Sequence, residues 1–468
     1  MDMQFWFGGN PMIFDKIFPP ATIHMIGIGG ISMSGLAEIL KNKGYIVKGS
    51  DMKDSDIIEK LRKTGIPVEI GHKAENVKDA DAVIFTAAVK KDNPEYLEAE
   101  KRGIPLIERS VLLGEITRMY SDTIAIAGTH GKTTTTSMIS AAFLEAEKDP
   151  TISVGGELNI IDGNYKIGNS KYFITEACEY VESFLEFSPK VAVILNVEAD
   201  HLDYYRDIEH IKSAFEKFEN RLTENGTAVL NIDDENSKHL ISNKKCNKVT
   251  FGIKNSADYT AKNIMIEKDL TTYDLYVKDK FCEKIELKIP GIHNVYNSLA
   301  CIAVCDIYGL KPDAVKRALK EFGGAKRRFE KKGEYNGALI YDDYAHHPSE
   351  IRATLSAAKG KKSKRIICVF QPHTYTRTKT LLKEFSEAFY GADSVIITDI
   401  YAAREKDNGE ISSKDLVNKI KETSDNAIYM ADFSEIEKYL KEKLQPGDLF
   451  LTIGAGDVYK IGEDIIEK

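Results

Sequence analysis

Short apolar runs alternate with segments of helical periodicity along nearly the whole chain. The runs are rich in β-branched residues, and the segments between them repeat apolar positions every three or four residues. This alternation is typical of parallel sheets with crossover helices, so the sequence predicts an α/β protein. We predict strands at residues 22–27, 45–49, 82–86, 123–127, 173–176, 191–196, 339–342, 366–370, 395–399, 428–430 and 449–453.

Two stretches of weaker patterning divide the chain into three α/β units. Residues 113–121 separate the first unit from the second, and residues 323–332 separate the second from the third. A length of 468 residues agrees with about three domains. Residues 226–290 alternate short strands with turn residues, which predicts a small antiparallel annex inside the middle unit.

Composition places the chain among soluble globular proteins. Hydrophobic residues make up 43%, charged residues 29%, and the net charge is −8, so we expect no nucleic-acid partner. No apolar run reaches the ~20 residues needed to cross a bilayer, and the six cysteines form no CxxC pair. We therefore expect a cytoplasmic enzyme with reduced thiols and no membrane insertion.

Residues 1–20 are apolar but lack the pattern of an export signal. Asp2 is acidic, no basic cluster precedes the apolar residues, and Gly8, Gly9 and Pro11 interrupt them. The role of this leader stays open, because it either packs on the first unit or is an appended segment.

A glycine-rich turn follows the first predicted strand. Gly27, Gly29 and Gly30 precede a helix, and Asp51 closes the next strand, as in a dinucleotide-binding fold. Ser32 stands where that motif has its third glycine, so the turn favours a nucleotide diphosphate without indicating NAD specifically. The alternative is a glycine turn that binds nothing.

A second turn, GTHGKTTTTS at residues 128–137, gives a stronger signal. Backbone amides of such a loop cradle phosphates, Lys132 reaches the β- and γ-phosphates, and the Thr133 hydroxyl coordinates magnesium. Ile126 replaces the first glycine of the strict motif. The four consecutive threonines that follow are poor helix formers. A role in binding explains them better than a surface turn with an incidental lysine does.

Polar residues follow two further strands of the middle unit. Glu176 ends one strand and His201 follows another, so both are expected beside the phosphate loop. Glu176 suits magnesium, which prefers oxygen ligands, whereas His201 alone is better explained as a structural histidine. Asn294 and Asn297 open a helix, which they could cap, or they could contact adenine. We expect three other acids to be solvated: Glu179, Glu182 and Glu186.

The third unit carries a polar loop, DDYAHHPSE at residues 342–350, directly after a strand. Arg377 follows the next strand and suits an anionic substrate, because arginine binds carboxylate or phosphate in bidentate fashion. Arg327 and Arg328 lie at the junction of the second and third units. Domain closure carries one of them to the γ-phosphate, or both are solvated linker charges.

The motifs taken together identify a family. They are HMIGIGGISMSGLAEIL, GTHGKTTTTSM, TEACEYVESFL, LNVEADHLDYY, GIHNVYNSLA, RRFE, DDYAHHPSE and QPHTYTRT, and in this order the chain resembles the Mur ligase family over residues 21–460. Within the family, His130 and LNVEADHLDYY indicate the branch that adds L-alanine to UDP-N-acetylmuramate. A murein tripeptide ligase acting on the same sugar nucleotide is the alternative.

The resemblance implies a fold, two cofactors and two substrates. The expected segments are the leader at 1–20, a UDP-sugar-binding Rossmann-like domain at 21–118, a central P-loop ATPase domain at 119–325, and an amino-acid-binding Rossmann-like domain at 326–468. The implied cofactors are ATP and Mg²⁺, and the substrates are UDP-N-acetylmuramate and L-alanine. A monomer or a homodimer is expected.

The resemblance also assigns residues to the site. The catalytic residues are Lys132, Glu176, His201, Arg327, His346 and Arg377, and the metal ligands are Thr133, Glu176 and His201. The ATP contacts are Gly128, Thr129, His130, Gly131, Lys132, Thr133, Thr134, Asn294, Asn297 and Asp343. The substrate contacts are Gly27, Gly29, Gly30, Asp51, Thr86, Arg109, Tyr344, His346 and Arg377.

Two positions depart from the family pattern. Cys178 stands where an acid is common, and Thr374 stands where an arginine is common. One of the two basic groups expected beside the carboxylate of the amino acid is therefore absent.

The resulting hypothesis is ATP-dependent amide formation through an acyl phosphate, with domain closure assembling the site. Two other functions are compatible with parts of the sequence. An NAD-dependent oxidoreductase would use the first glycine turn and leave the second unexplained, and a non-enzymatic nucleotide sensor would bind ATP without turnover.

Overall fold

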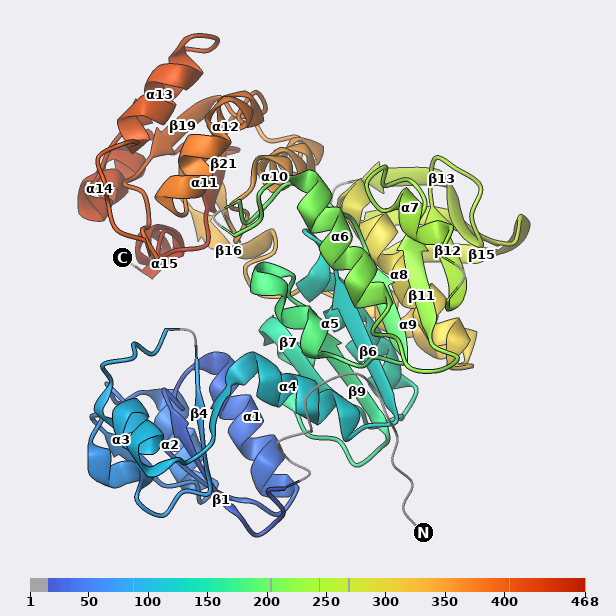
Figure 1. Ribbon diagram of the computed structural model, residues 1–468. Helices are drawn as coiled ribbons and strands as arrows, with labels where there is room; N and C mark the ends of the chain where they lie inside the picture. The colour runs from blue at the N-terminus through green and yellow to red at the C-terminus, as the bar shows by residue number, and fades with distance from the viewer. Residues whose placement is uncertain are drawn as a thin grey trace.

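Three α/β domains make up the computed structural model, which describes residues 16–86, 88–202, 204–243, 245–267, 270–403 and 405–467. Each domain contains one sheet with helices packed against it (Figure 1). The predicted α/β class with three domains is confirmed, and every predicted strand is present. Residues 1–15 of the leader lie outside the described residues. Its end packs on the first domain, where the Tyr45 hydroxyl donates to the Ile17 carbonyl at 3.0 Å.

The N-terminal domain has a five-stranded parallel sheet in the order β3-β2-β1-β4-β5. Its strand order reverses beside β1, so the turn after that strand, residues 27–30, opens at the switch point where α/β sheets bind ligands. The strands are β1 (Thr22–Ile26), β2 (Ile46–Asp51), β3 (Val68–Ile70), β4 (Ala82–Phe85) and β5 (Leu106–Glu108). The helices are α1 (Ile31–Asn42), α2 (Asp56–Lys63), η2 (Ala74–Val77), α3 (Pro94–Arg102) and α4 (Arg109–Arg118).

The central domain has a ten-stranded sheet in the order β15-β14-β13-β12-β11-β10-β6-β9-β7-β8. Its strands are β6 (Asp122–Ala127), β7 (Thr151–Leu158), β8 (Gly163–Lys166), β9 (Tyr172–Glu176), β10 (Val191–Ile194), β11 (Thr227–Asn231), β12 (Asn247–Gly252), β13 (Tyr259–Glu267), β14 (Leu270–Val277) and β15 (Lys280–Leu287). Its helices are α5 (Lys132–Glu145), η3 (Asn159–Ile161), η4 (Tyr180–Glu186), α6 (Ile208–Glu219), α7 (Lys238–Ile241), α8 (Ile292–Ile307) and α9 (Pro312–Glu321).

The predicted antiparallel annex at 226–290 is only partly right. β11 and β12 pair in parallel with the sheet, and antiparallel pairing begins only between β13 and β14. The annex is therefore an extension of the central sheet rather than a separate one. The turn residues between these short strands did not show whether the strands pair in parallel or antiparallel. The direction of pairing depends on which distant strand each strand lies beside.

Helix α5 owes its unusual composition to its position. Thr133, Thr134, Thr135 and Thr136 are all buried, with the helix in contact with β7, β9, α8 and α9. A helix buried on all sides carries no amphipathic stripe, and tertiary packing overrides the weak helix propensity of threonine.

The C-terminal domain has a six-stranded sheet in the order β16-β17-β21-β18-β19-β20, parallel except for the β16–β17 pair. Its strands are β16 (Glu330–Tyr335), β17 (Ala338–Asp343), β18 (Ile366–Phe370), β19 (Ser394–Ile397), β20 (Ala427–Tyr429) and β21 (Leu449–Ile453). Its helices are α10 (Pro348–Gly360), α11 (Tyr375–Thr380), α12 (Leu382–Ala388), α13 (Ser413–Lys421), α14 (Phe433–Lys443) and α15 (Tyr459–Glu467).

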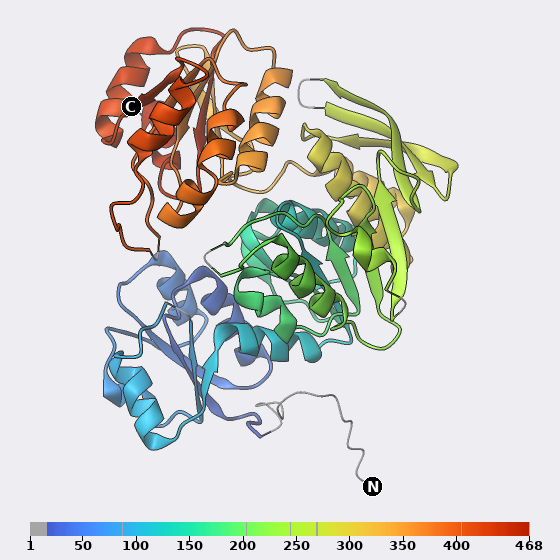
Figure 2. The same ribbon diagram turned by 45° about the horizontal axis from the view of Figure 1, so that its top comes forward.

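The three domains are joined in two different ways. One hydrophobic core runs from the N-terminal sheet through α4 into the central domain, where Leu112 and Ile116 belong to the same buried cluster as Phe173 and Phe184. The C-terminal domain has its own cores and sits above the N-terminal domain beside the central one (Figure 2). Within the described residues, no helix combines the length and the apolar character that a bilayer crossing demands.

Candidate active site

The turn between β6 and α5 has a backbone that only glycine accommodates at two positions. Gly128 has φ 141° and Gly131 has φ 85°, and a Cβ at Gly131 would lie 2.7 Å from Oδ1 of Asn297. Asn196, after β10, fixes the turn: its carbonyl accepts from the Thr129 amide at 3.1 Å, and its side-chain oxygen accepts from the His130 amide at 2.8 Å. The turn is thus rigid at the carboxyl edge of the sheet, where a phosphate meets a helix N-terminus.

Lys132 has a carboxylate partner that the sequence did not reveal. Its Nζ lies 2.9 Å from Oε2 of Glu179 and 3.1 Å from the Thr129 carbonyl. Burial alone would lower the pKa of Lys132, but the Glu179 carboxylate raises that pKa to about 12, so the ammonium stays charged. The expectation that Glu179 is solvated is wrong, because its side chain is 3% exposed. Glu182 pairs with Lys217 at 2.8 Å near the surface.

The three predicted metal ligands come from different elements: Thr133 from α5, Glu176 from the end of β9, and His201 from the loop after β10. The Glu176 carboxylate accepts from the Gly155 amide at 2.6 Å, and a Cβ at the next residue, Gly156, would lie 3.1 Å from the Thr133 methyl group. His201 places Nε2 3.8 Å from Oε1 of Glu179. Burial lowers the pKa of His201, so its imidazole is neutral and able to coordinate.

This donor set fits Mg²⁺ only in part. A hydroxyl, a carboxylate and an imidazole supply few oxygens, and Mg²⁺ usually completes its shell with waters and substrate phosphates. Among the described residues, the histidines, cysteines and acids here do not form a compact group of three ligands. The residues therefore suit an ion shared with a nucleotide rather than one enclosed by protein.

A cavity of about 630 Å³ lies between the central and C-terminal domains. Such a volume suits a nucleotide. Six of the predicted ATP contacts line it: His130, Gly131, Thr134, Asn294, Asn297 and Asp343. Gly128, Thr129, Lys132 and Thr133 are not among its lining residues.

The two asparagines of α8 do not cap their helix. Gly291 is the N-cap and has no side-chain cap, while Asn294 and Asn297 sit inside the helix. Asn294 donates to the Pro290 carbonyl at 2.7 Å and accepts from Asn297 at 3.2 Å. The capping interpretation is therefore wrong, and both residues line the cavity.

The two junction arginines have different surroundings. The Arg327 guanidinium donates to Asp342 at 2.9 Å and to the Gly454 carbonyl at 2.7 Å, and it lies over Tyr344. These contacts hold Arg327 within the C-terminal domain, away from the cavity lining. Arg328 lines the cavity, 3.8 Å from Oε1 of Glu350. The backbone directs these two adjacent side chains to different places. The sequence alone could not show which of them lines the cavity.

A second, smaller cavity of about 190 Å³ is lined by residues of the central and C-terminal domains. Arg377 of the C-terminal domain pairs with Asp200 of the central domain at 2.9 Å, and their side chains are 9% and 7% exposed. Although burial opposes the charge of Asp200, the guanidinium keeps the pKa of Asp200 well below its usual range. The predicted residues His201, Tyr344, His346 and Arg377 all line this cavity. Burial lowers the pKa of His346 to about 4, so its imidazole is neutral at pH 7.

The predicted substrate contacts of the N-terminal domain lie at its sheet edge. The Gly29 amide donates to Asp51 at 3.0 Å, so Asp51 braces the turn. Arg109, at the start of α4, donates to the Ser32 hydroxyl at 3.2 Å. Gly27 and Gly30 belong to the same turn, which closes through a bond from the Gly30 amide to the Gly27 carbonyl at 3.1 Å. Thr86 follows β4 next to β1.

Comparison with known proteins matches all three domains. Residues 22–121 match the Mur ligase family catalytic domain, residues 126–305 the Mur ligase middle domain, and residues 327–456 the Mur ligase glutamate ligase domain. A UDP-N-acetylmuramate–L-alanine ligase from Acetivibrio thermocellus is 55% identical over 94% of this chain and 94% of its own.

Solved structures give the same picture. The UDP-N-acetylmuramate–alanine ligase from Thermotoga maritima is 33% identical, with a TM-score of 0.80 over 95% of this chain and 98% of its own. A murein peptide ligase from Psychrobacter arcticus is 24% identical, with a TM-score of 0.71 over 96% of this chain and 98% of its own, a likeness of fold alone.

Proposed function

The chain belongs to the Mur ligase family, and we propose on that premise that it joins L-alanine to the carboxylate of UDP-N-acetylmuramate in peptidoglycan precursor synthesis. ATP drives the reaction and leaves as ADP and phosphate. The supporting observation is the interdomain cavity, which gathers His130, Asn294 and Asp343 beside the phosphate turn. We place the reaction in the cytoplasm, where both nucleotides are available.

The proposed chemistry begins with the carboxylate of the sugar nucleotide. A carboxylate is a poor electrophile, so transfer of the γ-phosphoryl group to it gives an acyl phosphate that an amine can attack. Lys132 neutralises phosphate charge, since Glu179 keeps it protonated. Thr133, Glu176 and His201 would hold Mg²⁺, which when bound offsets the charge of the transferring phosphoryl group.

The smaller cavity suits an amino-acid zwitterion. Arg377 offers a guanidinium to a carboxylate, and Asp200 offers a carboxylate to an ammonium group. The two groups pair with each other at 2.9 Å. A bound zwitterion would replace this ion pair with one between Arg377 and its carboxylate and one between Asp200 and its ammonium group. His346 is neutral near pH 7 and suits orientation of the amine better than its deprotonation. The volume of about 190 Å³ favours a small side chain.

The N-terminal domain is the proposed holder of the UDP-sugar. Gly27, Gly29 and Gly30 open at the helix N-terminus that favours a pyrophosphate, with Asp51, Thr86 and Arg109 around them. Tyr165 of β8 packs against α1, where a Cβ at Gly35 would lie 3.0 Å from its ring. This contact supports a fixed distance between the sugar nucleotide and the central domain.

The decisive experiment measures phosphate release from ATP with UDP-N-acetylmuramate and a panel of L-alanine, glycine, L-serine and the murein tripeptide. We expect L-alanine to give the highest kcat/KM. Turnover with the tripeptide but not with L-alanine would overturn the proposal, and so would ATP binding without turnover on any acceptor. The relatives of about 50–55% identity carry the alanine ligase name, so the tripeptide alternative is not favoured.

A further inference from the structure

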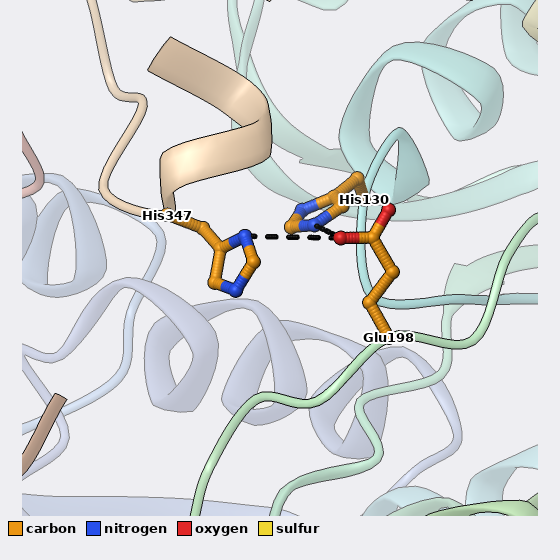
Figure 3. A group of neighbouring side chains, drawn as sticks. All are labelled: His130, Glu198 and His347. Atoms are coloured by element: carbon orange, nitrogen blue, oxygen red, sulfur yellow. Dashed lines mark hydrogen bonds and ion pairs between the residues drawn. The ribbon is translucent and has the colours of Figure 1, made fainter. Parts of the chain in front are cut away.

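A cluster of two histidines and a glutamate lies where α10 meets the central domain, apart from the residues assigned to Mg²⁺. His130 comes from the phosphate turn, Glu198 follows β10, and His347 precedes α10 (Figure 3). His130 Nε2 lies 3.3 Å and His347 Nδ1 lies 3.9 Å from the same oxygen, Oε2 of Glu198. All three donor atoms lie within 4.8 Å of one another.

The far nitrogen of each imidazole faces an oxygen acceptor. Nδ1 of His130 lies 3.1 Å from Oε1 of Glu350, and Nε2 of His347 lies 3.3 Å from the Ala199 carbonyl. Nε2 of His130 is also within hydrogen-bond distance of Glu198, so a bound ion would take the place of the proton between them. Metal-binding histidines are oriented by such carboxylate and carbonyl partners.

Ser349 contacts the near nitrogens of both imidazoles. The Ser349 hydroxyl lies 2.9 Å from Nε2 of His130 and 2.7 Å from Nδ1 of His347. The Ser349 amide also donates to Nδ1 of His347 at 3.4 Å, so a bound ion would replace these hydrogen bonds at the near nitrogens. Two carboxylates lie beside His130, Glu198 at 3.3 Å and Glu350 at 3.1 Å, so the pocket attracts positive charge.

The donor set selects the kind of ion. Two imidazole nitrogens and one carboxylate oxygen, with a fourth position open, are typical of zinc and similar ions rather than of magnesium. Tetrahedral bonds of about 2.0–2.1 Å place neighbouring ligand atoms about 3.3 Å apart. The separations of 3.3 and 3.9 Å require only a small rotation of the side chains.

We propose that His130, Glu198 and His347 bind a divalent transition-metal ion of the zinc type across the interface between the central and C-terminal domains. The ion ties the phosphate turn to the start of α10. His130 and Glu198 also line the large cavity, so the bound ion restrains the opening of that cavity and slows turnover. The site makes the domain interface sensitive to the supply of such ions.

The test uses Co²⁺ as the probe, added to the full-length protein in excess Mg²⁺. We expect one equivalent to bind and to give the visible d–d bands of a tetrahedral site. His347→Asn removes a ligand while keeping a good helix N-cap, and we expect Co²⁺ affinity to fall by at least about 100-fold. His239→Asn is the matched control, since His239 is a half-buried histidine on α7, and it should bind Co²⁺ like the wild type.

Three results would overturn the proposal. They are unchanged Co²⁺ affinity in His347→Asn, no tetrahedral bands in the wild type, and a thiolate-to-cobalt charge-transfer band, which would place the ion on a cysteine. Glu198→Gln is the second variant if His347→Asn does not fold, with an expected loss of at least about 10-fold. Binding should also raise the thermal unfolding midpoint of the wild type but not of His347→Asn.

Discussion

At the scale of single residues, the site depends on charges that are buried with their partners. Lys132 is held by Glu179, and Arg377 is held by Asp200. A buried charge with a good partner stays ionised, whereas the same charge left alone is strongly destabilised. In each pair the carboxylate therefore keeps the cation charged, and the cation can attract an anionic group of a substrate.

Lys132→Ala tests the proposed role on phosphate. We expect alanine-dependent phosphate release to fall by at least about 100-fold, because a preorganised charge on the transferring phosphate is lost. UDP-N-acetylmuramate binding, measured by calorimetry, should change little, since the proposed site for it lies in the N-terminal domain. Loss of sugar-nucleotide binding in this variant would contradict the division of roles between domains.

Arg377→Ala tests the proposed amino-acid site. Loss of a charge-assisted contact of about 1.5–3 kcal/mol should raise the KM for L-alanine about 10-fold or more, with the KM for ATP far less affected. Arg365→Ala is the matched control, because Arg365 pairs with Asp448 elsewhere in the same domain. Steady-state kinetics with each substrate varied in turn makes the comparison, and an unchanged KM for L-alanine would remove Arg377 from the site.

At the scale of elements, strand, turn and helix work together at the phosphate site. β6 ends at the sheet edge, the turn reverses through two left-handed glycines, and α5 begins at Lys132. Asn297 of α8 closes against the turn from the other side. The geometry of the turn therefore depends on a helix far away in sequence.

Gly131→Ala tests this dependence. A left-handed alanine costs about 1–2 kcal/mol, and its Cβ would also meet Asn297 at 2.7 Å. We expect the KM for ATP to rise by about 10-fold. Gly360→Ala is the control, since a Cβ there meets nothing within 4 Å, and it should leave the KM for ATP unchanged.

A buried carboxylate ties several elements of the N-terminal domain together. Glu95 of α3 accepts from Ser50 of β2 at 2.6 Å and lies 3.5 Å from His24 of β1. Burial opposes its charge, but the adjacent His24 imidazole and the hydrogen bonds from Ser50 and Asn76 hold the pKa of Glu95 below its ordinary 4.5. The lowered pKa means that the carboxylate stabilises the fold most above pH 4.5, and that this contribution is lost as the pH falls toward the lower folded value.

Glu95→Gln measures that contribution. The advantage of the wild type in free energy of unfolding should be full above about pH 4.5 and should shrink below it. Denaturant unfolding across this range gives the difference. Glu100→Gln, an exposed position on the same helix, should show no such trend, and a constant difference for Glu95→Gln would contradict the assignment.

At the scale of the whole molecule, the two interfaces of the central domain differ in kind. The N-terminal domain shares an apolar core with it, whereas the described contacts of α10 and α11 with it include ion pairs and hydrogen bonds such as Glu350–His130 and Arg377–Asp200. Polar interfaces exchange protein contacts for water at low cost, so relative motion is expected there. We therefore expect the C-terminal domain to be the part that moves when a nucleotide binds.

Hydrogen exchange tests this division. Amides of α4 should be strongly protected with or without ligands, because opening there would expose the shared core. Amides near the start of α10 should gain protection when ATP is added. The result that would contradict this assignment is ligand-dependent protection in α4 with none at α10.

The motifs predict most residues of the candidate site. The glycines of the turns, Lys132 and Thr133 follow from local chemistry, because phosphate loops are continuous in sequence. Glu179 and Asp200 carried no comparable signal, since an acid becomes a partner only when folding buries it beside a cation. The roles assigned to individual site residues remain predictions.

Local patterns were enough to predict the α/β class, the strand positions and the two glycine-rich turns, because periodicity and glycine act within a few residues. Folding in three dimensions was needed to show which of Arg327 and Arg328 lines the cavity and how residues 226–290 join the central sheet. It also brings His130, Glu198 and His347 together. Those outcomes depend on side-chain direction and on contacts between distant segments, which a linear pattern does not encode.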